Sequence, residues 1–240
     1  MRHAKKRVNA ARAAILFATG VAVLFSGIGL ARAQRAAPAA EVSLDELMKP
    51  TDLPDIAVGS PDAKITVVEY SSLTCPHCAH FATKVFPDFK TKFIDTGKVR
   101  FITRDFPLDN LAAAASMLAR CLDNDKAFAF IDTLFTTQDT WAHGEGNPVP
   151  RLFEVSKPAG FTKESFDKCL TDQALLDKVT AARTRAGEKF QINSTPTFFV
   201  NGKRLTGVNQ VEDFAKLINP LLEANAGPAA PATDPKPDPK

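Results

Sequence analysis

The stretch that decides the fold runs from residue 67 to residue 78 and reads Val-Val-Glu-Tyr-Ser-Ser-Leu-Thr-Cys-Pro-His-Cys. It places Cys75 and Cys78 between an apolar run typical of a strand and a pattern typical of a helix. Two thiols separated by two residues at the start of a helix can form a reversible dithiol–disulfide couple. The order strand, cysteine, helix therefore favours a redox motif over two cysteines that are close by chance.

The expected start of the helix makes Cys75 the more acidic of the two thiols. The first turn of a helix has unpaired N–H groups and about half a positive charge, so a thiolate at Cys75 should have a pKa below the free value of roughly 8.5. Pro76 suits the first helical position, where no N–H is needed, and His77 is a second source of positive charge. Cys78 lies about one turn further on, where it can attack a mixed disulfide at Cys75.

A zinc or copper site is the alternative for this motif. Such a site needs more ligands, and the chain contains no second C-x-x-C or C-x-x-H. Outside the motif and the N-terminal segment only His80 and His143 are available, and Cys121 and Cys169 stand alone. The sequence therefore predicts no metal, and a metal carrier stays the less favoured hypothesis.

The first 33 residues have the features of a signal peptide. Basic residues lie between positions 2 and 7, an apolar stretch covers 13–30, and Ala31-Arg32-Ala33 is a small-residue cleavage signal. The apolar stretch is about 18 residues long, near the lower limit for a membrane-spanning helix, so an uncleaved anchor is the alternative. In either case we expect an exported, periplasmic protein.

The leader also explains the net charge of +3. Residues 1–33 contain six Lys or Arg and no acidic residue, which leaves 24 basic and 27 acidic residues in the rest of the chain. A mildly acidic mature protein gives no electrostatic support for binding nucleic acid, and we predict no such partner.

The chain is expected to hold one domain interrupted by an insertion. Residues 34–54 read as an N-terminal linker and 225–240 as a disordered tail rich in Pro and Ala. Between them we predict an α/β fold in two parts, residues 55–106 and 192–224, with an α-helical insertion over 107–191.

The predicted elements follow from apolar spacing and turn residues. Pro87 should kink the helix that follows the motif, Thr162 is a plausible N-cap, and Asn201-Gly202 is a strong hairpin signal. Residues 58–62 are predicted to form a turn and 141–158 an irregular segment. The expected strands are 64–70, 99–104, 197–200 and 203–206, and the expected helices are 78–93, 111–122, 128–135, 162–170, 175–190 and 211–222.

With a second segment, Ser-Thr-Pro-Thr-Phe-Phe-Val-Asn-Gly at 194–202, and Trp141, the chain resembles the DsbA family of exported thiol:disulfide oxidoreductases over residues 55–224. The resemblance implies a thioredoxin-like fold with an inserted helical domain. It further implies that Cys75 is the nucleophile, Cys78 the buried resolving thiol, and Thr195-Pro196 a cis bond that binds the substrate backbone; taken alone, this X-Pro bond would be read as trans.

The resemblance also gives a role to Glu69, which lies where the family keeps a buried acid. A buried Glu near Cys78 would have a raised pKa and could relay protons, whereas a solvent-facing Glu on an edge strand is the plain alternative. Arg104, at the end of the second expected strand, is the candidate for its charge partner. The Thr at position 195 departs from many strongly oxidising relatives, which have Val there.

Cys121 and Cys169 are each expected on the apolar face of a helix in the insertion. An exported protein in an oxidising compartment favours a structural disulfide between them, and two free buried thiols are the alternative. A bridge across 48 residues could stabilise the fold by roughly 4 kcal/mol in the chain-entropy model.

These features predict a periplasmic oxidase that donates its Cys75–Cys78 disulfide to reduced exported proteins. No flavin or nucleotide motif appears, so we expect no cofactor, and the resemblance implies reoxidation by a quinone-linked membrane partner. We expect a monomer. A reductase or isomerase kept reduced by a membrane donor remains the alternative, although residues 34–55 are too few for a dimerisation domain.

Overall fold

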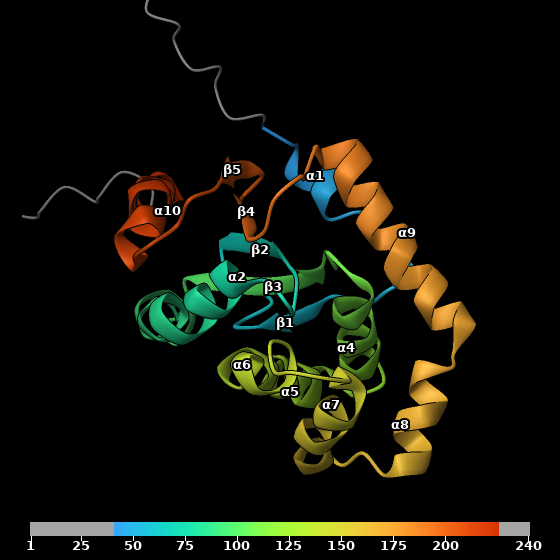
Figure 1. The fold of residues 1–240 in the computed structure, drawn as a ribbon. Coiled ribbons are helices and arrows are strands. Elements are labelled where there is room, and N and C mark those ends of the chain that lie inside the picture. Colours follow the sequence, from blue (N-terminus) through green and yellow to red (C-terminus); the bar gives the residue numbers. More distant parts are fainter. Residues whose placement is uncertain (1–40, 226–240) are drawn as a thin grey trace, which may run out of the picture. The chain divides into compact units, whose positions relative to one another are not determined.

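The computed structural model describes residues 41–225, which form a five-stranded sheet with helices on both faces (Figure 1). The strand order is β1-β3-β2-β4-β5. The central strand β2, Ile65–Ser71, runs parallel to β3, Val99–Asp105, and antiparallel to β4, Thr197–Val200. The edge strands are β1, Ile56–Val58, and β5, Lys203–Leu205, and both pair antiparallel. The α/β fold class is confirmed.

Helices occupy three regions of the described chain. The first region precedes β3, the second lies between β3 and β4, and the third follows β5. The helices are α1 Leu44–Leu47, α2 Pro76–His80, α3 Phe86–Phe89, α4 Asn110–Arg120, α5 Asn124–Thr136, α6 Gln138–Trp141, α7 Pro148–Ser156, α8 Lys163–Leu170, α9 Gln173–Phe190 and α10 Val211–Asn225; two π-helical turns, η1 Phe81–Val85 and η2 Lys90–Ile94, and one 3₁₀ turn, η3 Lys157–Ala159, complete them.

Side-chain alternation along β2 divides the core into layers. Ile65 and Val67 pack with the helices that follow the motif and with α10, in a cluster rich in phenylalanine. Val68 and Tyr70 point to the other face, where Phe190 at the end of α9 covers them. The remaining core lies among helices α4 to α9 and includes both cysteines of the motif. The motif therefore lies where the sheet meets the helical insertion.

The helix after the motif is continuous but irregular, as Pro87 predicts. A π-helical turn, Phe81–Val85, precedes Pro87, which lies in the first turn of α3. Proline has no N–H and its ring crowds the carbonyl four residues earlier, so the backbone widens at this point. A second π-helical turn, Lys90–Ile94, ends the helix.

Three parts of the fold differ from the expectations. The strand β1 was not predicted; it includes Val58 of the expected turn and forms because it pairs with β3. Residues 141–158 are not irregular throughout, because α7 begins at Pro148, whose missing N–H costs nothing in a first turn. Asn147 caps this helix by accepting a hydrogen bond from the Val149 N–H at 3.0 Å. In addition, part of the segment read as a linker is folded: Leu47 of α1 is fully buried against the sheet.

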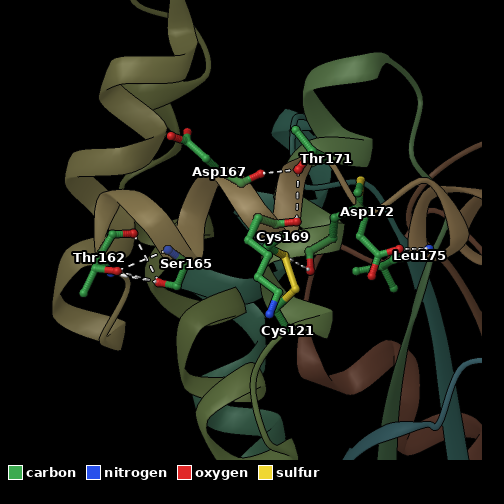
Figure 2. Close-up of a disulfide and its surroundings, with 10 residues drawn as sticks. Cys121, Thr162, Ser165, Asp167, Cys169, Thr171, Asp172 and Leu175 are labelled. Atoms are coloured by element: carbon green, nitrogen blue, oxygen red, sulfur yellow. Dashed lines mark hydrogen bonds between the residues drawn. A yellow bond between two sulfur atoms is a disulfide. The ribbon is translucent and has the colours of Figure 1, made fainter.

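A disulfide joins Cys121, at the end of α4, to Cys169 in α8 (Figure 2). The predicted N-cap of α8 is present, since Thr162 and Ser165 form a reciprocal capping box beside this bridge. The disulfide joins the end of α4 to α8 through two cysteines that are 48 residues apart in sequence.

The predicted signal peptide, residues 1–33, and almost all of the predicted tail lie outside the described residues. Between residues 41 and 225, no helix is both long and apolar enough to cross a membrane.

Candidate active site

Cys75 is the N-cap residue of α2, with Pro76 in the first turn. Its carbonyl accepts hydrogen bonds from the N–H groups of Cys78 and Ala79, both at 3.1 Å, and its own N–H donates to the Ser72 carbonyl at 3.0 Å. The backbone of the motif is thus fixed on both sides of the first sulfur. Both thiols are free, so the structure represents the dithiol form.

The surroundings of Cys75 favour its thiolate and lower its pKa to about 5. The largest cause of the lowered pKa is a hydrogen bond from the Cys78 thiol. The Thr195 hydroxyl and the N–H groups of Cys78 and His77 lower the pKa further, whereas burial raises it. The His77 side chain itself is exposed, and its contribution at the sulfur comes through its backbone.

Cys78 has the opposite environment. It is fully buried, as the resemblance implies, whereas Cys75 keeps 6% of its surface exposed. Burial, the hydrogen bond to Cys75 and the negative charge of Glu69 raise the pKa of Cys78 well above its usual range. The two thiols of one motif therefore differ strongly in acidity.

Glu69 lies on the central strand and is 3% exposed, so the solvent-facing alternative is wrong. Burial, and to a lesser degree the negative charge of Cys75, raise the pKa of Glu69 to about 8. Its neighbour across the parallel pair is Thr103, whose hydroxyl weakly opposes this shift. A carboxyl in this position holds a proton at neutral pH and exchanges it near pH 8.

The hypothesis that Arg104 pairs with Glu69 is wrong. Arg104 follows Thr103 on β3, so its side chain points to the opposite face of the sheet. There Nε donates to Asp55 at 2.7 Å, and Nη1 donates to the Leu47 carbonyl at 2.6 Å. Among the described residues, no cation contributes to the pKa shift of Glu69.

Thr195 and Pro196 lie beside the first sulfur, and the bond between them is cis. The Cys75 thiol donates to the Thr195 carbonyl at 3.4 Å, across 120 residues of sequence. The Thr195 hydroxyl is buried and has no partner among residues 41–225 in the dithiol form. Both polar groups of Thr195 thus face the atom at which exchange would occur.

Gln138 of α6 was not found from the sequence. It is buried, and its Nε2 donates to the carbonyls of Leu73 at 2.8 Å and of Cys75 at 3.1 Å. Its Oε1 lies 3.3 Å from Nε2 of His143. The helical insertion therefore holds the loop that carries the nucleophile, and only a glutamine within an amphipathic stretch marked this contact in the sequence.

Trp141, which supported the resemblance, is fully buried and serves the insertion's own core. Its indole N–H donates to the Leu134 carbonyl at 2.8 Å. In the described part of the chain no group of three or more His, Cys, Asp or Glu side chains is arranged to hold a metal ion.

Residues 51–220 match the thioredoxin family. A solved structure, alpha-DsbA1 of Wolbachia pipientis, is 30% identical, covers 77% of this chain and 98% of its own, and superposes with a TM-score of 0.70. The chain belongs to the DsbA family. Another DsbA-like structure, BdbD of Bacillus subtilis, is 23% identical with a TM-score of 0.65 over 78% of this chain and 98% of its own, which shows the shared fold.

Curated relatives are named as protein-disulfide oxidoreductases. A protein of Rickettsia bellii named "Putative protein-disulfide oxidoreductase" is 37% identical over 150 residues, which is 62% of this chain. The chain spans 57% of the length of that relative, and 61% of the length of a similar protein of Rickettsia conorii.

Proposed function

We propose that this protein is an exported thiol:disulfide oxidoreductase that donates its Cys75–Cys78 disulfide to reduced proteins. The observation that carries the proposal is the difference in acidity within one motif, with the pKa of Cys75 lowered to about 5 and that of Cys78 raised well above its usual range. A stable thiolate at Cys75 favours the reduced form, and this makes the disulfide a good oxidant.

The reaction proceeds in two exchanges. A substrate thiolate attacks the Cys75 sulfur, the bond to Cys78 breaks, and the electron pair goes to the Cys78 sulfur. Because Cys78 is a poor thiolate, it takes a proton, and the Glu69 carboxyl, with a pKa of about 8, is the proposed donor. A second substrate thiolate then attacks the substrate sulfur, and Cys75 leaves as a stable thiolate without needing a proton.

The substrate is proposed to lie along Thr195. An extended peptide that reaches Cys75 passes the Thr195 backbone, whose carbonyl is 3.4 Å from the Cys75 sulfur. Backbone pairing of this kind accepts many sequences, as an enzyme for diverse exported proteins requires. Return to the disulfide form is assigned to a quinone-linked membrane partner, and the protein is proposed to act as a periplasmic monomer.

A redox titration against glutathione and a rate assay test this proposal together. We expect an equilibrium constant typical of oxidising members of this fold, and rapid oxidation of a reduced, unfolded protein by the Cys75–Cys78 disulfide. Cys75→Ala should abolish the oxidation, and Cys121→Ala with Cys169→Ala should retain it. A potential near that of thioredoxin, with efficient reduction of insulin, would instead favour the reductase or isomerase alternative.

A further inference from the structure

A small cavity lies beneath the active site, between the sheet and α5. Its volume is about 20 Å³, and its walls are mostly phenylalanine rings from the helix after the motif, from β3 and from α5. Three polar side chains also line it, and these are Glu69, Thr103 and Asp132. A cavity of this size holds about one water molecule where polar partners are present.

The buried end of the cavity carries an unsatisfied acceptor. Oε1 of Glu69 is buried and has no hydrogen-bond partner within residues 41–225. Thr103 faces Glu69 across the β2–β3 pair. A carboxyl oxygen and a hydroxyl that line the same small space supply the two or more polar partners that a buried water needs.

The outer end of the cavity carries a second carboxyl. Asp132 lies on α5 between Phe128 and Phe135, one turn away on either side, which line the same cavity. It is exposed to solvent, and partial burial raises its pKa from the usual value. No hydrogen bond or ion pair of Asp132 occurs in the described structure, so it has no evident structural task.

Among the residues that line the cavity, only Glu69 and Asp132 carry groups that titrate. Cys75 and Cys78 interact with Glu69 on the active-site side, and Asp132 lines the same cavity. The β3 side contributes Thr103, and the β4 residue paired with Glu69 is Phe198. Aromatic rings thus insulate one polar route from the buried carboxyl to the surface.

We propose that this cavity is the proton path of the active site, in which a water bound by Glu69 and Thr103 passes protons between Glu69 and the exposed Asp132. The proposal rests on the proposed function. When Cys78 leaves as the disulfide breaks, it takes the proton of Glu69; the water reprotonates Glu69 and recovers a proton from solvent at Asp132. One proton is taken up from solvent for each mixed disulfide formed, and the same route releases it on reoxidation.

The test compares Asp132→Asn with Asp125→Asn, which changes an exposed carboxyl of the same helix that does not line the cavity. The oxidised full-length protein is mixed with a peptide that has one thiol, and the mixed disulfide is trapped by acid and counted by mass spectrometry. Between about pH 6 and pH 8 we expect Asp132→Asn to slow its formation about 10-fold, while Asp125→Asn matches the wild type.

Two further measurements separate proton transfer from a loss of structure. Formate, a small acid that can replace the missing carboxyl, should restore the rate of Asp132→Asn and leave the wild type unchanged. Thr103→Val should slow the reaction in the same direction without changing the Cys75 pKa. Equal rates for Asp132→Asn and Asp125→Asn, or a defect that formate does not restore, would overturn the proposal; a wild type that forms no mixed disulfide would overturn the proposed function itself.

Discussion

Cys75 and Cys78 are only three residues apart, yet hydrogen bonds surround one sulfur and apolar side chains surround the other. Cys75 caps a helix, and its thiolate is favoured by the Cys78 thiol, by the nearby Thr195 hydroxyl and by backbone N–H groups, whereas burial raises the pKa of Cys78. At the scale of single residues, function therefore depends on which groups can stabilise a charge on sulfur.

Thr195→Val tests one of these groups. The buried Thr195 hydroxyl has no partner among the described residues of the dithiol form, and it helps to lower the pKa of Cys75. Its loss should raise the Cys75 pKa from about 5 by about half a unit to one unit. The absorbance of the thiolate during a pH titration measures this, with Thr206→Val, at an exposed position, as the control. An unchanged pKa would show that the backbone and Cys78 suffice.

Glu69→Gln tests the buried carboxyl through stability. The pKa of Glu69 is about 8 when folded and 4.5 ordinarily, so between these values the unfolded chain has lost a proton that the folded protein keeps. Folding stability therefore falls as the pH rises from about 4.5 to about 8, and the full loss is reached above that window. Glu69→Gln should remove this slope and be more stable at pH 8 by roughly 2–4 kcal/mol.

Urea denaturation of the oxidised protein at several pH values is the appropriate measurement. In that form Cys75 carries no charge, so the difference in slope between Glu69→Gln and the wild type reports the burial of Glu69. Parallel stability curves for Glu69→Gln and the wild type would contradict a buried, titrating carboxyl.

At the scale of elements, the short helix α6 holds the active-site loop in place through one side chain. Gln138 lies more than 60 residues from that loop, and yet its amide satisfies the carbonyls of Leu73 and Cys75. The helical insertion thus fixes the position of the nucleophile as well as enlarging the core.

Gln138→Leu should remove the side-chain donor of the Leu73 carbonyl and one of the hydrogen bonds to the Cys75 carbonyl, which keeps its bonds from backbone N–H groups. Because unsatisfied buried polar groups are costly, we expect a loss of about 1–3 kcal/mol in the free energy of unfolding and slower exchange at Cys75. His143→Ala is the matched control, since it removes only the longer contact of 3.3 Å to the same glutamine. Urea unfolding and a single-turnover exchange rate measure the two effects, and equal stability for both variants would argue against the role of Gln138.

At the scale of the whole molecule, the described chain has cores on both faces of the sheet and a third core within the helices. The third core contains Cys75 and Cys78 together with Cys169, so the redox motif and the disulfide of α8 share one packed region. Changes in the insertion can therefore reach the active site through packing.

Removing the Cys121–Cys169 bridge should destabilise the whole fold. A cross-link over 48 residues lowers the entropy of the unfolded chain, so Cys121→Ala with Cys169→Ala should lose about 4 kcal/mol of stability. Urea unfolding under oxidising conditions measures the loss. In excess reductant the difference between wild type and variant should largely vanish, and a difference that persists there would assign the loss to side-chain packing instead.

Local patterns in the sequence were enough to predict most of the strands and helices of this protein. The strands at 65–71 and 197–200, the Asn201-Gly202 hairpin and the N-cap Thr162 each follow from a few adjacent residues, because backbone preferences act over short distances. The same holds for the two cysteines at the start of a helix.

Only the tertiary structure decided which distant side chains meet. In the structure Arg104 pairs with Asp55 and points away from Glu69, and Gln138 donates a hydrogen bond to the active-site loop. It also enclosed Glu69 in a cavity that reaches Asp132. These contacts join residues that are tens of positions apart, and they depend on strand register and helix packing, which no local pattern specifies.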